Sequence, residues 1–486
     1  MIATETATGT VSFYINGVWE TPQGRKLEGV TNPATGARIA EVPYAVAADV
    51  DRAVQAAHAA FLKWRDVPVV DRVQVMYRFK ALLDKYADDV AAVLTRENGK
   101  TKDDARMEVR RMIQMVEVAC GMPSLMMGDS LNDVAQGIDC KTIRQPIGVC
   151  VGITPFNFPA MVPTWMYPFA IASGNTFVLK PSEKVPLTPT RAVELLHDAG
   201  LPPGVFNLLH GGKESVDALL RHPLVKAVSF VGSTPVAKYI YATAAAEGKR
   251  VQALGGAKNH LVVMPDADMP KTVEAIIGSA FGAAGERCLA GSVLVAVGDA
   301  AGPLLELLVS RTKSLAVGDG SQNAIEMGPL VTSDHCQRVR GYVDKGAAEG
   351  ATPLVDGREL QAGGGYFLGP TIFDHVTPEM TIAREEIFGP VLSVMRVGTL
   401  DEAIDLVNRS PFGNATAIFT SNGKAAREYS SRIEVGMVGV NVGVAAPMAF
   451  FPFAGWKNSF FGDLHAHGKD AVAFYTEQKV IMSRWF

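Results

Sequence analysis

The chain has 486 residues, of which 48% are apolar and 20% charged, and its formal net charge at pH 7 is −4. This length predicts two or three domains with room for a cleft between them, and the composition argues against long disordered regions. The nearly balanced charge gives no reason to expect nucleic acid or an acidic membrane surface as a partner.

The five cysteines are odd in number and contain no C-x-x-C pair, so they suggest neither a disulfide framework nor a zinc site. We interpret the neighbouring His465 and His467 as loop residues and expect no metal. Residues 1–10 lack the pattern of a secretory signal, and no stretch reaches the roughly 18 apolar residues of a membrane helix. These features predict a cytoplasmic protein, and a processed organellar form is the alternative.

In chain order, short alternating runs in the first 45 residues predict a small hairpin region, as in Val11-Ser-Phe-Tyr-Ile15 before Asn16-Gly17. Apolar residues then recur at intervals of three and four. This spacing predicts amphipathic helices over 50–64, 69–98 and 104–120, and Gly99 would end the second. We expect these helices to cover a sheet.

The helix predicted over 104–120 separates two adjacent arginines. Arg110 falls on a polar stripe and is expected in water, whereas Arg111 shares its stripe with Met107 and Met115. An arginine on an apolar stripe either extends its head to water or has an anionic partner. The sequence leaves both open.

Between residues 147 and 232 strand and helix patterns alternate. The predicted strands cover 147–153, 176–179, 205–209 and 227–231, and the predicted helices cover 161–172, 188–199 and 214–221. This alternation is typical of parallel βαβ units in a doubly wound sheet. Such sheets bind ligands at the carboxyl ends of their strands, where Lys180 and Ser233 fall. No G-x-G-x-x-G follows a strand, but Gly232-Ser233-Thr234-Pro235 offers a helix start that can meet a phosphate.

A second alternating set predicts another α/β domain, with strands over 293–297, 371–373, 391–396, 415–419 and 438–441. This domain carries Cys288. We predict a helix over 272–284 that stops at Gly285, which would leave Cys288 in a tight loop. The tail over 471–486 is rich in strand-forming residues and is expected to pair with another segment or subunit.

The stretch around Cys288 has features of a nucleophile. The thiolate is the reactive form of cysteine, and the neighbouring guanidinium of Arg287 favours it. Small residues just before it leave room for a ligand. A cysteine is more often a small buried hydrophobe, so the stretch by itself does not decide between the two roles.

Five motifs together resemble the aldehyde dehydrogenase superfamily over nearly the whole chain. They are Pro155-Phe-Asn157-Phe-Pro159, Lys180-Pro-Ser-Glu183, Phe230-Val-Gly-Ser-Thr234, Gly285-Glu-Arg-Cys288 and Glu385-Glu-Ile-Phe-Gly-Pro390. Further segments resemble the CoA-acylating methylmalonate-semialdehyde dehydrogenases within it. These segments include Pro123-Ser-Leu-Met-Met-Gly128, Gly256-Ala-Lys-Asn-His260 and Ala446-Pro-Met-Ala-Phe-Phe-Pro452.

The resemblance implies an α/β fold of three parts. A Rossmann-type NAD-binding domain would cover 1–124 and 148–255, and an α/β catalytic domain 256–455. A small β element for oligomerisation or bridging would cover 125–147 and 456–486. The resemblance also implies a homo-oligomer, either a dimer or a tetramer.

The resemblance assigns roles to individual residues. Cys288 would attack an aldehyde, and the Asn157 amide with the Cys288 backbone N–H would hold the oxyanion; one such donor is typically worth about 3 to 4 kcal/mol. The residues implied to bind NAD are Thr154, Phe156, Lys180, Glu183, Ser233, Glu386 and Phe388. Glu183 favours NAD over NADP, because a carboxylate beside the ribose would repel a 2′-phosphate.

The chain departs from the family pattern where hydrolytic members carry a glutamate. Their E-L-G-G-K motif activates water, whereas this chain reads Gln252-Ala253-Leu-Gly-Gly-Ala-Lys258, and we interpret Ala253 as the replacement. General-base help is ordinarily worth about 10² to 10⁴ in rate, so a thiol becomes the better acceptor of the acyl group. In the subfamily this thiol is coenzyme A.

Arg111 and Arg287 also gain a role, because the resemblance implies that such a pair binds the carboxylate of the substrate. The implied reaction oxidises methylmalonate or malonate semialdehyde, with loss of CO₂, to propionyl-CoA or acetyl-CoA. Two alternatives stay open. One is a hydrolytic NAD-dependent aldehyde dehydrogenase that produces a free acid, and the other is an inactive relative that serves as a binding protein.

Overall fold

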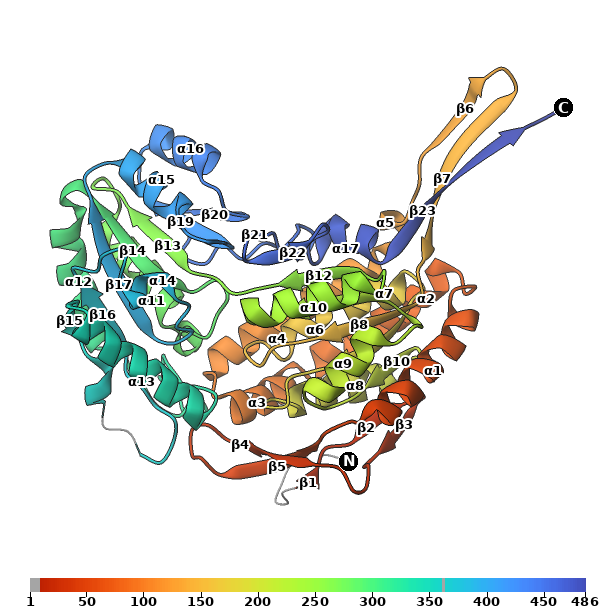
Figure 1. Cartoon of the computed structure of the whole chain (residues 1–486), viewed down its shortest axis with the longest axis horizontal. Helices are drawn as coiled ribbons and strands as arrows, with labels where there is room; N and C mark the ends of the chain where they lie inside the picture. Colours follow the sequence, from red (N-terminus) through yellow and green to blue (C-terminus); the bar gives the residue numbers. More distant parts are fainter. Residues whose placement is uncertain (1–8, 361–362) are drawn as a thin grey trace.

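The computed structural model describes residues 9–360 and 363–486. In this part of the chain two large β-sheets form the centres of two lobes, and three small sheets flank them (Figure 1). The alternating strand and helix patterns predicted an α/β protein, and the structure confirms this fold class. Within the same ranges, none of the helices combines the length and the apolar character that a membrane span requires.

The first lobe is built on an eight-stranded sheet whose five central strands are parallel. From one edge to the other it contains β22 (Phe460–Gly462), β12 (Arg250–Leu254), β11 (Val225–Val231), β8 (Val149–Ile153), β9 (Thr176–Lys180), β10 (Phe206–Leu208), β2 (Phe13–Ile15) and β3 (Val18–Glu20). The predicted hairpin is present as β2 and β3, with positive φ at Asn16 and Gly17. The predicted βαβ arrangement is therefore confirmed.

Helices cover both faces of this sheet and enclose two apolar cores. One face carries α1 (Ala47–Trp64), α9 (Lys213–Arg221) and α10 (Thr234–Ala246). The other carries α2 (Val69–Lys85), α3 (Ala87–Asn98), α4 (Lys102–Cys120), α5 (Met122–Leu125), α6 (Met161–Thr164), α7 (Tyr167–Ala172) and α8 (Leu187–Asp198). Two predicted helices are each split in two. The helix over 69–98 breaks at Tyr86, whose φ of −109° and ψ of 20° leave helical geometry, and the one over 161–172 breaks after Thr164.

The second lobe has a seven-stranded sheet that is parallel except at the β15 edge. Its strands are, in order, β15 (Thr352–Val355), β16 (Thr371–Asp374), β17 (Val391–Val397), β14 (Gly291–Val297), β13 (Asn259–Val263), β19 (Ala415–Phe419) and β20 (Met437–Val440). Its helices are α11 (Met269–Ala280), α12 (Ala301–Lys313), α13 (Ser333–Ala348), α14 (Thr381–Arg384), α15 (Leu400–Asn408) and α16 (Gly423–Arg432). All five strands predicted for this region are present.

The remaining strands form three small sheets, of which one projects as an arm (Figure 1). The arm contains β23 (Thr476–Arg484), β7 (Ile138–Pro146) and β6 (Ser130–Ala135). The other two contain β1 (Gly9–Thr10), β5 (Arg38–Pro43) and β4 (Leu27–Thr31), and β18 (Phe412–Gly413) with β21 (Trp456–Lys457). The tail pairs with β7 along its whole strand, as predicted, although its first part is helix α17 (Gly468–Phe474) and not strand.

The expected division into domains stays a proposal. The structure differs from it in one segment near the C-terminus. Segment 456–486 was expected to belong to the bridging element as a whole. Its strand β22 instead pairs with β12 at the edge of the eight-stranded sheet, whereas β23 joins the arm.

Candidate active site

Cys288 lies in a strained turn between α11 and β14. The helix predicted to run to residue 284 ends at Ala280, and a 3-10 turn follows over Gly282–Gly285. Ala283, Ala284 and Gly285 all have positive φ, of 49°, 53° and 71°. A Cβ at Gly285 would lie 2.3 Å from the carbonyl oxygen of Gly389, so only glycine fits there. Strain of this kind is concentrated at functional sites.

Two asparagines of the second lobe hold the backbone of Cys288. The Nδ2 groups of Asn259 and Asn414 both donate to its carbonyl oxygen, at 2.9 and 2.8 Å. Asn259 begins β13, and Asn414 comes just before β19. The turn is therefore held by side chains at the starts of two strands of the seven-stranded sheet.

Two cavities meet at Cys288, which lines both. One has a volume of about 740 Å³ and extends along the carboxyl ends of β8, β9 and β11. The other has a volume of about 280 Å³ and lies against α4. A ligand in each cavity would therefore reach the same sulfur from different sides.

The larger cavity brings together all seven residues predicted to bind NAD. Thr154, Phe156, Lys180, Glu183, Ser233, Glu386 and Phe388 line it, together with Asn157. Their roles stay predictions, because the structure contains no ligand. Their positions at the ends of parallel strands are those at which a doubly wound sheet binds nucleotides.

The residues of the larger cavity fit a dinucleotide. Lys180 Nζ donates to the carbonyl of Gly211 at 2.9 Å and lies 3.5 Å from the Glu183 carboxylate, at the end of β9. Ser233 is the N-cap of α10, and within the described residues its side chain makes no capping bond. The hydroxyl and the first amides of this 13-residue helix are thus available for an anion such as a phosphate.

Glu386 is held at the other end of the cavity by backbone of the 255–258 loop. Its Oε1 accepts a hydrogen bond from the N–H of Ala257 at 2.9 Å. A Cβ at Gly256 would lie 2.3 Å from its Oε2, so glycine lets the carboxylate approach. Burial raises the pKa of Glu386, whereas this backbone bond and the charge of Lys258 lower it.

Asn157 lines the larger cavity together with Cys288, and its oxyanion role stays a prediction. Its Nδ2 donates to the carbonyl oxygen of Glu286 at 2.9 Å, two residues before Cys288. The buried Lys100 donates to its backbone carbonyl. An amide NH₂ has two hydrogens, so one of them is free to meet an oxyanion formed at Cys288.

The expected effect of Arg287 on the thiol is outweighed. Burial, with a smaller contribution from the charge of Glu386, raises the pKa of Cys288 to about 12, and the opposing effect of Arg287 is weaker. The reason lies in the partners of Arg287, whose guanidinium bonds to Asp104 at 2.6 Å and to the Gly278 carbonyl at 3.1 Å. The Asp104 carboxylate therefore balances much of its positive charge.

The smaller cavity carries one positive charge in excess. Lys100 pairs with Glu108 at 2.5 Å, and Arg287 pairs with Asp104. Arg111 also lines this cavity, but within the described residues it has no carboxylate partner. In the described part of the chain its side chain donates hydrogen bonds to Gln114 Oε1 and to the sulfur of Met448, both at 3.2 Å. Arg111 is therefore a half-buried cation that faces a cavity. Arg110 is exposed, as predicted.

The interpretation of Ala253 as the replaced glutamate is wrong. In the E-L-G-G-K motif the glutamate stands four residues before the lysine, and four residues before Lys258 is Leu254. Successive strand residues point to opposite faces. Ala253 packs into the core that contains Phe230, whereas Leu254 belongs to the core against which Cys288 packs. The departure from the hydrolytic pattern is therefore a leucine at 254.

Sequence reasoning missed several residues that build the site. Asp104 and Glu108 balance the cations of the smaller cavity, and Asn259 and Asn414 hold Cys288. Glu108 had a usable signal, because it lies between Ala105 and Met112 on the buried stripe of α4, where an acid requires a partner. The asparagines had none, since they act through contacts between distant segments.

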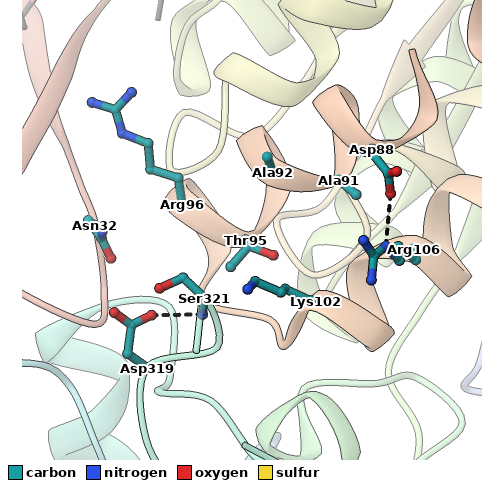
Figure 2. A pocket seen from close by; sticks show the side chains of 10 residues that line it. All are labelled: Asn32, Asp88, Ala91, Ala92, Thr95, Arg96, Lys102, Arg106, Asp319 and Ser321. Atoms are coloured by element: carbon teal, nitrogen blue, oxygen red, sulfur yellow. Dashed lines mark hydrogen bonds and ion pairs between the residues drawn. The ribbon is translucent and has the colours of Figure 1, made fainter. Parts of the chain in front are cut away.

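A third cavity, of about 340 Å³, lies at the start of α4 beside α3 (Figure 2). Figure 2 shows Arg106 facing Asp88, with which it forms an ion pair of 2.8 Å, and the Asp319 carboxylate accepting from the Ser321 backbone N–H at 2.8 Å. Lys102 adds a further positive charge. The cavity contains none of the predicted site residues, so we assign no part of the reaction to it.

A profile of the aldehyde dehydrogenase family matches residues 19–481. The chain belongs to the aldehyde dehydrogenase family. It is 55% identical over 473 residues to malonate-semialdehyde dehydrogenase 1 of Bacillus licheniformis, an alignment that covers 97% of this chain and 98% of that one. This membership confirms the resemblance that the motifs indicated.

Two solved structures of the family are similar along their whole length. The methylmalonate-semialdehyde dehydrogenase of Oceanimonas doudoroffii has a TM-score of 0.96 at 50% identity, over 98% of both chains. A protein of Sinorhizobium meliloti, described as a methylmalonate-semialdehyde dehydrogenase and complexed with NAD, has a TM-score of 0.97 at 45% identity, over 99% of both chains. The aldehyde dehydrogenase fold expected from the sequence is thus confirmed.

Proposed function

We propose that the protein is an NAD-dependent, CoA-acylating dehydrogenase of malonate and methylmalonate semialdehyde. The observation that carries this proposal is the uncompensated charge of Arg111 in the cavity that ends at Cys288. A cation in a partly apolar cavity favours a substrate with a carboxylate. The relatives named for these substrates support the same choice.

Cys288 is the nucleophile in this proposal. Its sulfur attacks the aldehyde carbon and forms a thiohemiacetal, whose oxyanion is held by the free N–H of the Asn157 amide and the Cys288 backbone N–H. Burial raises the pKa of Cys288, so the sulfur is mostly protonated at neutral pH, and its proton passes to solvent as the bond to the aldehyde carbon forms. The strained turn keeps the sulfur at the junction of the two cavities.

The larger cavity would hold NAD, and the relative from Sinorhizobium meliloti that is complexed with NAD supports this assignment. When bound there, NAD supplies a hydride acceptor. Lys180 and Glu183 would bind the adenosine ribose, Ser233 a phosphate, and Glu386 with Phe388 the nicotinamide end. Thr154 and Phe156 contribute cavity wall. Loss of hydride from the thiohemiacetal leaves a thioester on Cys288.

The substrate carboxylate would bind Arg111 and Arg287. Arg287 can contribute because it lines the cavity, although Asp104 already takes part of its charge. In the acyl-enzyme this carboxylate stands β to the thioester carbonyl, so the bond to CO₂ can break as an enolate forms. The products are acetyl-CoA from malonate semialdehyde and propionyl-CoA from methylmalonate semialdehyde.

Coenzyme A would accept the acyl group, because the smaller cavity offers water no free carboxylate base. Asp104 and Glu108 are both engaged in ion pairs there, and Leu254 stands where the hydrolytic motif has its glutamate. Burial lowers the pKa of His467 to about 4, which makes it a weak base. A thiol requires less activation than water and transfers the acyl group by thioester exchange.

The test compares NADH production from malonate semialdehyde with and without coenzyme A. We expect sustained turnover with coenzyme A and no more than about one NADH per site without it, and mass spectrometry should identify acetyl-CoA. Sustained turnover to a free acid without any thiol would favour the hydrolytic alternative. Absence of even a single NADH per site would favour the inactive relative.

We also propose a homo-oligomer joined through the arm. Its strand β23 is an edge strand, and the arm exposes apolar side chains at Leu131, Val134, Val480, Met482 and Trp485. Contiguous exposed apolar side chains on an edge strand mark a surface that another chain covers. A second copy of the chain is the partner expected to cover it.

A further inference from the structure

The reaction proposed above produces a carbanion that needs a proton. When the acyl group on Cys288 loses CO₂, the electron pair of the broken C–C bond passes into the thioester and leaves an enolate. The α-carbon of this enolate must take up one proton to give the acetyl or propionyl group. In the proposal the departing carboxylate is bound at Arg111, so the α-carbon lies in the smaller cavity. The proton donor is therefore sought among the residues that line this cavity.

Most polar groups of the smaller cavity cannot supply a proton. Arg111 and Arg287 are guanidinium groups, which do not lose protons in proteins. Asp104 and Glu108 are carboxylates in ion pairs, and an ionised carboxylate only accepts hydrogen bonds. Burial lowers the pKa of His467 to about 4, so its ring is neutral at pH 7 and is not an acid there. The apolar and indole side chains of the wall carry no acidic hydrogen.

Lys100 also lines the smaller cavity, and its ammonium is an acid. An ammonium has three N–H groups. One of them donates to the Glu108 carboxylate and another to the backbone carbonyl of Asn157. Among the residues that the structure describes, no oxygen accepts from the third. The nitrogen lies 3.7 Å from the ring centroid of Phe158, which belongs to the same cavity wall, so the third N–H is left for a group bound in the cavity.

The backbone around Lys100 holds this ammonium in one place. Gly99 ends α3 with a φ of 87°, and a Cβ there would lie 2.7 Å from the ring of Pro329. The next residue, Thr101, caps α4 through its side chain. Burial lowers the pKa of Lys100, although the charge of Glu108 opposes this shift. Lys100 is therefore a fixed ammonium and a stronger acid than a lysine in water.

We propose that Lys100 is the acid that protonates the α-carbon of the enolate after CO₂ has left. This inference rests on the proposed function, because it requires an acyl group with a carboxylate β to the thioester carbonyl. In this step one N–H bond of Lys100 breaks, a C–H bond forms at the α-carbon, and the thioester carbonyl is restored. The lysine becomes a neutral amine and regains its proton from solvent. This return is favourable, because a neutral Lys100 leaves the buried Glu108 without a counter-ion.

Water in the cavity is the rival donor, and the two donors differ in direction. An enolate is planar and can be protonated from either side. A fixed ammonium reaches one side, whereas mobile water reaches both. The configuration of the protonated carbon therefore reports which donor acts.

The first test makes propionyl-CoA from methylmalonate semialdehyde in D₂O, in reactions shorter than the exchange of the substrate's own α-hydrogen. The α-carbon of the product then carries one hydrogen and one deuterium, and NMR of a derivative with a chiral amine shows its configuration. The wild type should give a single configuration. Lys100→Arg keeps the positive charge but does not release its protons, so it should give both configurations.

The second test compares two substrates. The acyl-enzyme formed from propanal has no CO₂ to lose and needs no proton at its α-carbon. Lys100→Arg should therefore lower kcat for malonate semialdehyde at least about tenfold more than kcat for propanal, since a general acid typically contributes about 10² to 10⁴ in rate. The matched control is Lys249→Arg, because Lys249 is a buried lysine outside both cavities that donates to the carbonyl of His222. This control should keep the single configuration and the ratio of the two kcat values.

A further variant covers the case in which Lys100→Arg does not fold. Lys100→Met combined with Glu108→Gln removes the ion pair as a unit and leaves no unpaired buried charge, and the same two results are expected from it. Both configurations in the wild-type product, a single configuration in the variants, or equal losses of kcat on the two substrates would each overturn the role of Lys100. A wild-type protein that forms neither acetyl-CoA nor CO₂ from malonate semialdehyde would instead overturn the proposed function.

Discussion

At the scale of single residues, the charge balance of the smaller cavity depends on Arg111. Replacement by glutamine keeps polarity and most of the length but removes the charge. We expect Arg111→Gln to lower kcat/KM for malonate semialdehyde about 10- to 100-fold, because one charge-assisted hydrogen bond contributes roughly 1.5 to 3 kcal/mol. Its kcat/KM for propanal, which has no carboxylate, should change less than about threefold.

Arg110 offers a matched control for this measurement, since it is adjacent in sequence, exposed and outside the cavity. Arg110→Gln should leave both substrates unaffected. Equal losses on malonate semialdehyde and propanal in Arg111→Gln would mean that the arginine supports packing and does not select the carboxylate.

Leu254 and Ala253 provide a second residue-scale test. Leu254→Glu places a carboxylate on the face of β12 toward Cys288, at the motif position of the hydrolytic glutamate. We expect CoA-independent turnover to rise at least about tenfold, a part of the 10² to 10⁴ that a general base can contribute. The measurement is steady-state NADH production without any thiol, with thermal unfolding as the check on folding.

The neighbouring substitution is the control. Ala253→Glu would bury a carboxylate in the apolar core on the opposite face, where it should destabilise the protein without increasing hydrolysis. A gain in CoA-independent turnover from Ala253→Glu and not from Leu254→Glu would contradict the strand geometry on which the assignment depends.

At the scale of elements, the sequence predicted most helices and strands because their apolar spacing was regular. It failed where a local change of backbone interrupts a regular pattern. Tyr86 splits a continuous amphipathic stretch into α2 and α3. The helix α11 ends at Ala280, earlier than Gly285 suggested, and a 3-10 turn with positive φ at Ala283 follows it. Such breaks arise from packing against other elements, which periodicity does not report.

The motifs predicted the larger cavity well, since residues at the ends of parallel strands converge by topology alone. The smaller cavity was only half predicted. The sequence indicated two of its three cations, Arg111 and Arg287, but neither Lys100 nor the carboxylate partners. The pairing of Arg287 with Asp104, for example, joins segments far apart in the chain. The opposite faces of β12 on which Ala253 and Leu254 lie likewise required the three-dimensional structure.

Glu108 joins three elements and gives the test at this scale. It accepts from the backbone N–H groups of Ala160 and Met161, at 2.8 and 3.1 Å, and pairs with Lys100, which in turn donates to the Asn157 carbonyl. Glu108→Gln would leave the buried Lys100 without an anion. We expect a loss of about 3 to 5 kcal/mol in the free energy of unfolding, measured in urea, and a lower kcat.

A control lies on the same helix. Glu117 pairs with Lys80 at 3.3 Å, but this pair is exposed, so Glu117→Gln should change the free energy of unfolding by less than about 1 kcal/mol. If the two variants were equally stable, the buried network of Glu108 would not be what holds α4 against the Asn157 loop.

At the scale of the whole molecule, the arm is the part that the single chain leaves unprotected. It projects from the end of the first lobe, away from the second (Figure 1), and the side chains of Val480 and Met482 on β23 are 62% and 67% exposed. Neither lobe packs over them, so their burial requires another chain. Subunit interfaces often form where an edge strand exposes apolar side chains. Charged side chains at these positions of the strand prevent such pairing.

We therefore expect the double substitution Val480→Glu and Met482→Glu to reduce the mass of the assembly, measured by analytical ultracentrifugation, while each chain stays folded. Val70→Glu is the matched control, because Val70 is 54% exposed on α2 and lies outside the arm, so the assembly should persist. Since β23 pairs with β7 within the same chain through nine consecutive residue pairs, the arm can survive loss of its partner. A wild-type protein that sediments as a single chain, or a double variant that sediments like the wild type, would exclude the arm as the contact.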